Sequence, residues 1–352
     1  MVAFVDGPFL EEGHAQSDTH DEKGRLPNCE KGPEHHLEKE TNRSPSEPTG
    51  SRSMAEEDPL SYESGDRTLY HLPPRTHSET HNSDAYDLGG LVEALEKDGV
   101  VVLPNVFSRN QIESFRRAHE ENFATVESLV SEQRRQPPPL KPYRHDFDKK
   151  RYYLMPHYEI QEEKTGEWKE VIEISPGRLD YTFGMNGGRD DDGSSSGRDD
   201  DDDAFGSAEF QRPKILAELM QRMLRADFQS YAGTLTSAGK SSEGPWHRDT
   251  YLLFDDETID IRLPPYYFTV LIPLVAVDDQ NGATEFLKGS HKQTCREALD
   301  LLRHQPSFQP CASPGSVIVF DGRICHRGGQ NLTEEHRTVL YQVWTKMWYN
   351  DY

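Results

Sequence analysis

The stretch GSVIVFDGRICHRGGQN, residues 315–331, contains a short apolar strand that is followed, beyond a glycine, by His326. It lies near the end of a run of strand-like segments that are parted by Gly, Pro and Asn turns. Helical patterns precede this run. The order predicts a mainly β fold with flanking helices, either an antiparallel barrel or a jelly roll. The predicted strands of the run are Phe228–Ser237, Trp246–Phe254, Tyr267–Val277, Ala283–Leu287, Ser316–Asp321 and Thr338–Trp348.

The expected helices follow from capping signals and from the spacing of apolar residues. Ser108 followed by Gln111 is a capping-box pattern, and it starts a helix at Arg109 that runs toward Val130. Pro213 opens a second helix, in which apolar residues recur at i, i+3 and i+4. The other predicted elements are helices Leu88–Lys97 and Arg296–Arg303 and strands Val100–Leu103, Lys169–Ile174 and Leu179–Phe183.

The apolar residues are unevenly distributed along the 352 residues, of which only 34% are hydrophobic. Residues 1–85 are rich in Glu, His, Ser, Pro and Gly, which predicts a disordered tail. Residues 86–352 suffice for one large domain. Within it, residues 186–209 predict a flexible acidic insert. Eight Asp and two Arg between Arg189 and Asp203 contribute −6 of the net charge of −23.

Composition also limits the class of function. An acidic chain is a poor match for nucleic acid or for an anionic membrane surface. No apolar run approaches the ~18 residues of a membrane span. The four cysteines show no CxxC spacing, and no secretory or peroxisomal signal is recognised at either end. We therefore expect a soluble cytoplasmic protein, and the oligomeric state stays open.

His247, Asp249 and His326 form the pattern with the clearest chemistry. On a strand, positions i and i+2 point to the same face, so His247 and Asp249 can bind one metal ion together. His326, at the end of a distant strand, can supply a third ligand. Two imidazoles and one carboxylate are the facial triad of non-heme iron(II) oxygenases. A single His is more often an ordinary core or surface residue, but the joint pattern predicts a catalytic iron site.

Arg337 lies eleven residues beyond His326, after a glycine-rich turn. The chain can double back there, which would point the guanidinium into the same barrel as the metal. A guanidinium is a planar fork that matches a carboxylate, so Arg337 is a candidate for binding a dicarboxylate cosubstrate. The alternative is a surface ion pair with Glu334 or Glu335.

Several motifs resemble those of the phytanoyl-CoA dioxygenase family. The stretch NGATEFLKGSH, residues 281–291, resembles the family's NG…PGSH segment, and residues 315–331 resemble its distal histidine motif. Arg337 matches the cosubstrate arginine. Residues 95–120, with DGVVVLPNVFS, resemble the N-terminal helix–strand–helix. The resemblance covers residues 86–352 apart from the acidic insert.

The resemblance implies a double-stranded β-helix enzyme that uses iron(II), 2-oxoglutarate and O2. His247, Asp249 and His326 would hold the iron, and Arg337 would bind the distal carboxylate of 2-oxoglutarate. Such enzymes convert 2-oxoglutarate and O2 to succinate and CO2 while they oxidise a C–H bond, and ascorbate is a candidate stimulant. Related halogenases have a small residue in place of the carboxylate ligand. The presence of Asp249 therefore favours hydroxylation.

Two positions depart from the family pattern. Lys288 stands where a proline usually precedes the GSH motif, and Gly328 stands where relatives often carry a hydroxyl two residues after the distal His. A second contact to 2-oxoglutarate must then come from elsewhere. Thr234 is the preferred candidate, with Thr269 and Thr284 as others, although each is equally typical of an ordinary strand residue.

Three residues are candidates for contacts with the substrate. Arg178 and Tyr181 lie in the segment GRLDYTF ahead of the acidic insert, and Trp246 is adjacent to the first metal ligand. Their alternatives are an ion pair between Arg178 and Asp180 and ordinary packing of the two aromatic rings. The basic stretch Lys141–Arg151 is expected to be a solvated loop.

Two other functions compete with the hydroxylase of a small-molecule or lipid-like substrate. A catalytically silent jelly roll could bind a ligand or a protein partner, but it would be free to lose any of the four motif residues. A metal-dependent hydrolase on a cupin-like barrel would need a zinc-activated water and a general base, and it would have no use for Arg337. The intact set favours the hydroxylase.

Overall fold

A computed structural model of the protein describes residues 3–5, 86–146, 151–161, 168–183, 204–250, 252–254 and 256–349. These residues belong to one of two compact units, which comprises residues 1–7 and 70–352. The second unit, residues 8–69, lies outside the described residues.

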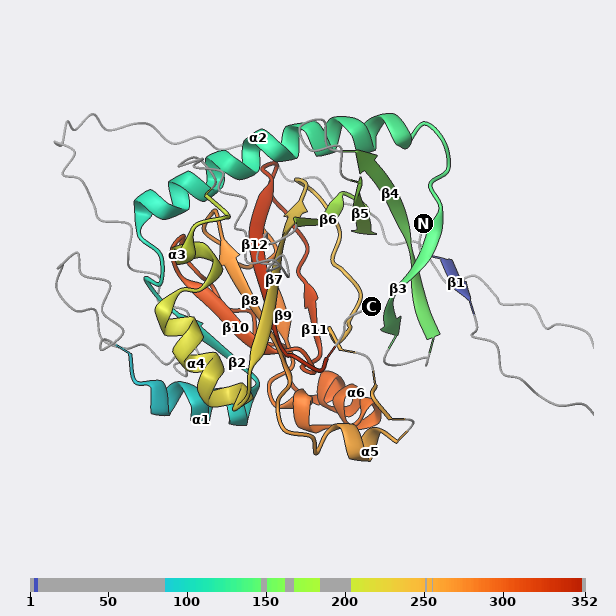
Figure 1. Ribbon diagram of the computed structural model, residues 1–352. Helices are drawn as coiled ribbons and strands as arrows, with labels where there is room; N and C mark the ends of the chain where they lie inside the picture. Colours follow the sequence, from blue (N-terminus) through green and yellow to red (C-terminus); the bar gives the residue numbers. More distant parts are fainter. Residues whose placement is uncertain are drawn as a thin grey trace, which may run out of the picture. The chain divides into compact units, whose positions relative to one another are not determined.

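The described elements are helices and strands, of which helix α2 (Arg109–Gln133) is the longest (Figure 1). The helices are α1 (Leu88–Asp98), α2 (Arg109–Gln133), α3 (Ala208–Gln211), α4 (Lys214–Leu224), α5 (Glu257–Asp260) and α6 (Cys295–His304). The strands are β1 (Ala3–Val5), β2 (Val100–Leu103), β3 (Leu140–Asp146), β4 (Arg151–Gln161), β5 (Trp168–Ser175), β6 (Arg178–Phe183), β7 (Phe228–Ser237), β8 (Tyr267–Pro273), β9 (Thr284–Phe286), β10 (Val317–Asp321), β11 (His326–Gly328) and β12 (Arg337–Lys346).

Within the described part of the chain, ten strands form one antiparallel sheet. Its order is β1-β4-β5-β6-β7-β12-β8-β10-β2, and β3 pairs with β4 at one end. The centre of the sheet is the long β12, which pairs with β7 on one side and with β8 on the other. Strands that are distant in the sequence are therefore neighbours in the barrel wall.

A second, smaller sheet faces the first one. It consists of β9 and β11, extended by single bridges from His247 to His326 and from Phe308 to Phe286. Two facing antiparallel sheets with helices outside make a jelly roll, the double-stranded β-helix that the motifs led us to expect.

The predicted strand Trp246–Phe254 is wrong beyond the bridge at His247. The backbone N–H groups of Asp249 and Thr250 donate to the carbonyl of Gly322, and those of the following loop donate to the Asp260 carboxylate. Because a turn and a side chain take these donors, no ladder forms there.

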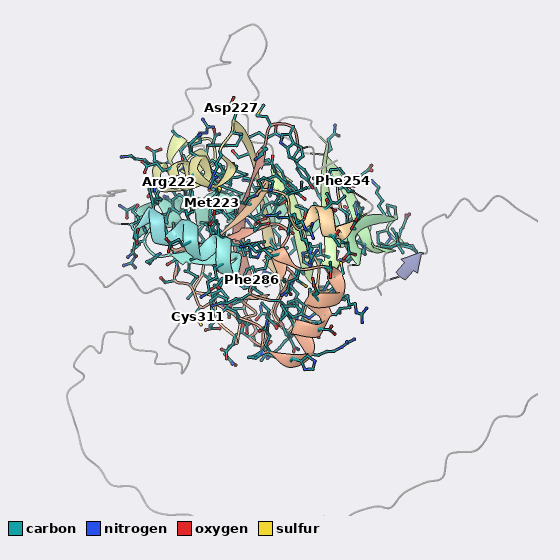
Figure 2. All side chains as sticks on the ribbon, turned by 90° about the horizontal axis from the view of Figure 1, so that it is seen from below. Arg222, Met223, Asp227, Phe254, Phe286 and Cys311 are labelled. Atoms are coloured by element: carbon teal, nitrogen blue, oxygen red, sulfur yellow. The ribbon has the colours of Figure 1, made fainter. Side chains whose placement is uncertain are left out.

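Two hydrophobic clusters lie on opposite faces of the main sheet. The outer cluster joins apolar residues of α1, α2 and α4 to alternate residues of the strands, such as Val270 and Leu340. The inner cluster fills the space between the two sheets, with Phe286 and Phe320 in edge contact at 5.0 Å. Phe286 is fully buried, whereas Phe254 and Cys311 are exposed (Figure 2). The alternation decides which side chains reach the interior of the barrel.

The expected helices are confirmed with small shifts of their ends. The Ser108–Gln111 capping box is formed, and Gly99 ends α1 in the left-handed conformation that glycine tolerates best. The expected solvated loop Lys141–Arg151 is wrong, because its first residues belong to β3 and its last residue begins β4.

The tail and the insert fall largely outside the described residues. Of the tail, Ala3–Val5 forms β1 against β4, which the prediction of disorder did not foresee. The insert was predicted to end at residue 209, but Phe205 already packs on Phe115 and Phe210, and α3 begins at Ala208. Among the described helices, none has the length and apolarity to cross a membrane.

His119 on α2 is a buried residue that the sequence patterns did not single out. Its ring contacts the hydroxyls of Thr234 at 3.3 Å and Thr236 at 3.5 Å, on the outer face of β7. Burial lowers the pKa of His119 from 6.5 to about 4.

Because the lowered pKa of His119 keeps its ring neutral in the fold, the unfolded chain binds the proton first as the pH falls. We expect a loss of about 3 kcal/mol of stability between pH 6.5 and 4 from this residue. Urea unfolding of His119→Gln should show a smaller loss of stability over this pH range than wild type. Identical pH profiles of stability for the two proteins would contradict this expectation.

Candidate metal centre

His247, Asp249 and His326 converge at the edge of the smaller sheet. The strand-like bridge between His247 and His326 places the two rings 4.4 Å apart. Asp249 Oδ1 lies 3.6 Å from Nε2 of His247 and 3.5 Å from Nε2 of His326. One ligand atom from each residue falls within 4.8 Å of the others, so a single ion can contact all three.

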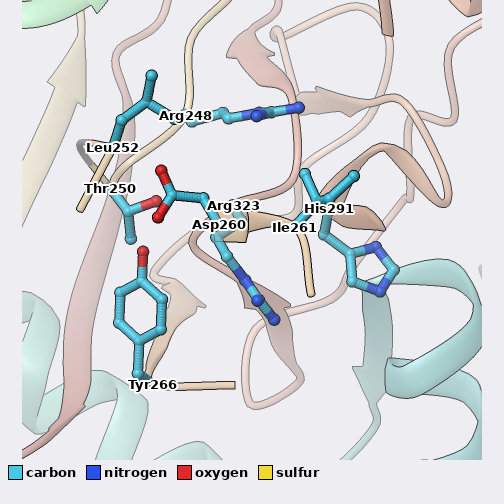
Figure 3. A pocket seen from close by; sticks show the side chains of 8 residues that line it. All are labelled: Arg248, Thr250, Leu252, Asp260, Ile261, Tyr266, His291 and Arg323. Carbon is cyan, nitrogen blue, oxygen red and sulfur yellow. The ribbon is translucent and has the colours of Figure 1, made fainter. Parts of the chain in front are cut away.

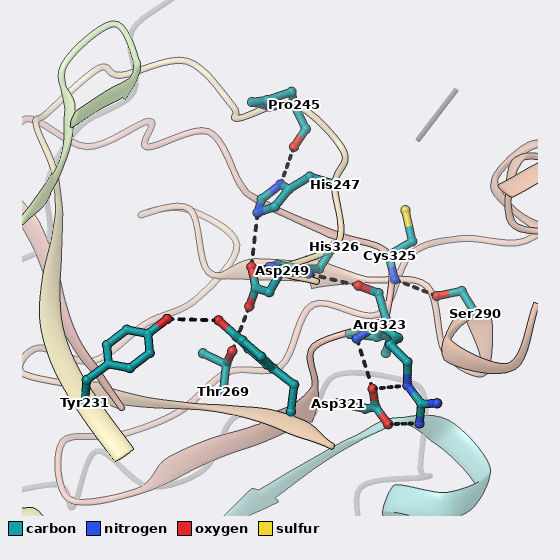
Figure 4. Close-up of polar contacts among 12 residues, drawn as sticks. Tyr231, Pro245, His247, Asp249, Thr269, Ser290, Asp321, Arg323, Cys325 and His326 are labelled. Atoms are coloured by element: carbon teal, nitrogen blue, oxygen red, sulfur yellow. Dashed lines mark hydrogen bonds and ion pairs between the residues drawn. The ribbon is translucent and has the colours of Figure 1, made fainter. Parts of the chain in front are cut away.

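Hydrogen bonds fix which atom of each residue is available to a metal (Figure 4). Nδ1 of His247 lies 2.9 Å from the Pro245 carbonyl, and Nδ1 of His326 lies 3.0 Å from the Ile324 carbonyl. A carbonyl only accepts, so each Nδ1 carries the proton and each Nε2 presents its lone pair. Thr269 donates to Oδ2 of Asp249 at 2.7 Å, which leaves Oδ1 directed at the imidazoles.

This donor set fits a divalent non-heme iron. Two neutral imidazole nitrogens and one carboxylate oxygen are the facial ligands of mononuclear iron(II), with the opposite positions left for other molecules. Phe320 and Phe286 pack beside His326 at 4.7 and 5.8 Å between ring centroids and shield it from water. The histidine tautomers, the carboxylate oxygen directed at the imidazoles and the apolar surroundings all match what such a metal needs.

Thr269 offers a test of this arrangement. Thr269→Val keeps the shape of the side chain but removes the hydrogen bond that orients Asp249, so we expect iron affinity to fall by about 10–100-fold. Titration with iron(II) under anaerobic conditions measures the change. Unaltered affinity would mean that the Thr269 hydroxyl does not position the carboxylate.

Arg337 is almost completely buried, at 1% exposure, and lies inside the barrel as the sequence predicted. Its Nη2 donates to Ser237 Oγ at 2.7 Å, while Nε has no hydrogen-bond partner. Burial, with a smaller contribution from the nearby charge of Arg178, lowers the pKa of Arg337 to about 9. The surface ion pair with Glu334 or Glu335 is thereby contradicted. A buried cation of this kind is suited to an anionic ligand.

Thr234 does not lie where a cosubstrate contact would be needed. It is three residues from Ser237 on β7, so its side chain is on the opposite face, where it contacts His119 of α2. The sequence missed Ser237, which supplies the hydroxyl next to Arg337. Thr284 pairs with Gly328 in the smaller sheet and is buried.

The three residues proposed for substrate contacts separate in the structure. Arg178 is on the inner face of β6 and is fully buried. Tyr181, an odd number of positions away, packs with Val126 and Val130 of α2 on the outer face. Trp246 also faces outward, against a cluster that includes Cys325, and the Arg327 guanidinium lies 4.8 Å from its ring centre. Tyr181 and Trp246 therefore have packing roles.

Other polar side chains inside the barrel were not predicted. The hydroxyls of Tyr231, labelled in Figure 4, and Tyr267 lie 3.3 Å apart, and Tyr341 donates to Asp180 at 2.9 Å. A Cβ on Gly233 would collide with the Tyr341 ring, so this glycine makes room for that contact. Strand parity places these groups on the face that carries Thr269 and Arg337.

A small cavity next to the metal ligands is a separate feature (Figure 3). It is lined by residues that include Arg248, Thr250, Asp260, Tyr266 and Arg323. Its volume of about 20 Å³ is room for about one water molecule. The cavity is thus too small for an organic substrate.

Comparison with known proteins adds to this geometry. The sequence profile of the family described as Phytanoyl-CoA dioxygenase (PhyH) matches residues 95–339. Dioxygenase af480 of Aspergillus fumigatus is 32% identical over 106 residues, which are 28% of this chain and 33% of that protein. Dioxygenase lolE1 of Epichloe uncinata is 26% identical over 120 residues, 32% of this chain and 43% of that protein. The chain thus aligns with less than half the length of these relatives.

Among solved structures, AviO1 from Streptomyces viridochromogenes Tue57 superimposes with a TM-score of 0.47 and 18% sequence identity. The superposition covers 75% of this chain and 97% of AviO1.

Proposed function

The chain belongs to the phytanoyl-CoA dioxygenase family, and from this premise we propose that it is an iron(II)- and 2-oxoglutarate-dependent dioxygenase. Its domain spans residues 86–352. Its substrate is a small or lipid-like molecule, which it hydroxylates at a C–H bond while 2-oxoglutarate and O2 become succinate and CO2. The observation that carries the proposal is the triad with both Nδ1 atoms hydrogen-bonded to carbonyls, facing the same barrel interior as Arg337, which forms no ion pair within the described residues and whose Nε has no hydrogen-bond partner.

Each residue has a defined task in this proposal. His247, Asp249 and His326 hold the iron, which supplies the activation of O2 when bound. Arg337, steadied by Ser237, binds the distal carboxylate of 2-oxoglutarate and so sets the distance of its keto acid from the triad. The barrel walls exclude water from the reacting atoms.

Hydroxylation is favoured over halogenation because Asp249 occupies the position that a halide would need. Its Oδ2 is held by Thr269, so the carboxylate is fixed toward the imidazoles. The free cysteines Cys295, Cys311 and Cys325 support a reducing, cytoplasmic compartment.

The proposal is tested by incubating the purified protein with iron(II), ascorbate, 2-oxoglutarate and O2, and by measuring succinate. Slow succinate formation without substrate is expected, because enzymes of this chemistry turn over 2-oxoglutarate uncoupled. Succinate formation that does not depend on iron, or none from protein that binds iron, would contradict the proposal. In the second case the silent jelly roll would be the better interpretation.

A further inference from the structure

We infer that Arg178 and Arg337 hold one carboxylate group of the cosubstrate between them, and that Gly328 makes this two-arginine site possible. The inference rests on the proposed function, because the carboxylate is the distal one of 2-oxoglutarate. Arg178, which the sequence suggested as a substrate contact, is here a contact of the cosubstrate. The inference also identifies the residue that replaces the hydroxyl expected two positions after His326.

The sheet register brings the two arginines onto one face. Arg178 of β6 is the direct partner of Ser237 of β7, and Ser237 is the direct partner of Arg337 of β12. Residues in one such row point to the same side, so both guanidiniums enter the barrel with the Ser237 hydroxyl between their strands. The lowering of the pKa of Arg337 by the charge of Arg178 agrees with this proximity.

Neither arginine has a counter-ion among the described residues. Arg178 Nη2 donates to the carbonyls of Gly329 at 2.6 Å and Ser242 at 3.5 Å, but its Nε and Nη1 have no partner. Burial lowers the pKa of Arg178 to about 10, which the charge of Glu243 partly opposes. Two desolvated cations that repel each other are stabilised by an anion placed between them.

Gly328 explains why Arg178 can occupy this place. A Cβ at position 328 would lie 1.5 Å from Arg178 Nη1, so any side chain there would displace the guanidinium. Gly328 is two residues after His326 on β11, and its missing side chain would point to the same side as that ligand. The guanidinium of Arg178 thus lies beside the metal centre, where a side chain at position 328 would otherwise be.

Such a site selects for a dicarboxylate. A 2-oxo acid without the distal carboxylate, such as 2-oxobutanoate, leaves both cations unpaired and gains nothing from Arg178. The distal carboxylate of 2-oxoglutarate forms ion pairs with both arginines, and such charge-assisted hydrogen bonds are stronger than those between neutral groups. Removing the Arg178 guanidinium should therefore weaken the binding of 2-oxoglutarate but not that of 2-oxobutanoate.

The test is calorimetric binding of 2-oxoglutarate and 2-oxobutanoate to the full chain, with manganese(II) in place of iron to prevent turnover. Arg178→Met should lower the affinity for 2-oxoglutarate by about 10–100-fold, and Arg178→Lys should lower it by less. Neither variant should change the affinity for 2-oxobutanoate. The matched control is Arg327→Met, an arginine of β11 that pairs with Glu285 on the outer face, and it should leave both affinities unchanged. Circular dichroism verifies the fold of each variant.

Gly328→Ser gives an independent check through coupling. Gly328→Ser should lower the affinity for 2-oxoglutarate in the wild-type background. It should have little further effect in Arg178→Met, because one change displaces and the other removes the same guanidinium. Additive losses would overturn the inference.

Two other outcomes overturn the inference and separate it from the proposed function. If wild type binds 2-oxoglutarate and Arg178→Met binds it equally well, only the two-arginine site fails, and Arg178 belongs to the substrate. If metal-loaded wild type does not bind 2-oxoglutarate at all, the proposed function fails as well.

Discussion

Replacing Asp249 with alanine is expected to abolish iron binding and to lower succinate formation by at least about 10³-fold. Loss of a residue that merely orients a ligand costs about 10–100-fold in metal affinity or activity, and Asp249 is proposed to be a ligand itself. Its carboxylate is also the charged member of the triad, with Oδ1 3.5–3.6 Å from both imidazole nitrogens. Without it, two neutral imidazoles remain. Metal analysis after gel filtration with iron(II), together with a succinate assay, measures both effects.

The control for Asp249→Ala is Asp256→Ala, which removes an exposed carboxylate that caps the short helix α5. It should retain iron and turnover. If Asp249→Ala kept stoichiometric iron and near-normal succinate formation, the triad would not be the metal centre.

Replacing Arg337 with methionine is expected to weaken the binding of 2-oxoglutarate by about 30-fold or more. Truncating one partner of a buried, hydrogen-bonded charge pair costs about 2–5 kcal/mol. Methionine has a similar length, so the loss reports the charge and its hydrogen bonds rather than a void. Calorimetry on the manganese-loaded protein measures it, and an affinity within a factor of about two of wild type would contradict the role of Arg337.

The same change should not destabilise the ligand-free fold. The pKa of Arg337 is lowered because burial penalises its charged form, so at neutral pH the charge opposes folding. Arg337→Met is therefore expected to melt at or above the temperature of wild type. At a concentration that saturates wild type, 2-oxoglutarate should raise the melting temperature of wild type by more than that of the variant. A variant that melts well below wild type would mean that Arg337 has a structural role.

The sequence pointed to the candidate metal ligands because the spacing of two of them is local. His247 and Asp249 are two residues apart, and their common orientation follows from that spacing in any extended segment. The same rule, applied one residue earlier, turns Trp246 outward once His247 faces the metal. The outward position of Trp246 could thus have been predicted.

Contacts that depend on strand register could not be predicted from the sequence. Ser237 and Thr234 are both hydroxyl residues of β7, and only the pairing with β6 and β12 reveals that Ser237 faces Arg337. A shift of one residue would exchange their faces. Tyr181 was misplaced for the same reason.

β3 and β4 were not predicted because these two strands lack a clear alternation of polar and apolar residues, whereas β5 was predicted to within a residue at each end. β4 carries charged and aromatic residues on a long strand, and Lys141 of β3 forms ion pairs with Glu159 and Glu170 across neighbouring strands. Cross-strand charge pairs support a sheet without leaving an apolar signature in the sequence. The basic composition of residues 141–151 therefore resembled that of a loop.

The most direct measurement is an anaerobic titration of the iron(II)-loaded protein with 2-oxoglutarate, followed by visible absorption. Bidentate chelation of iron(II) by a 2-oxo acid gives a weak charge-transfer band. We predict a saturable band in wild type that is absent in His247→Ala and needs far more 2-oxoglutarate in Arg337→Met. A folded wild-type protein that binds iron(II) but develops no band would contradict the assignment of the barrel as a 2-oxoglutarate-dependent dioxygenase.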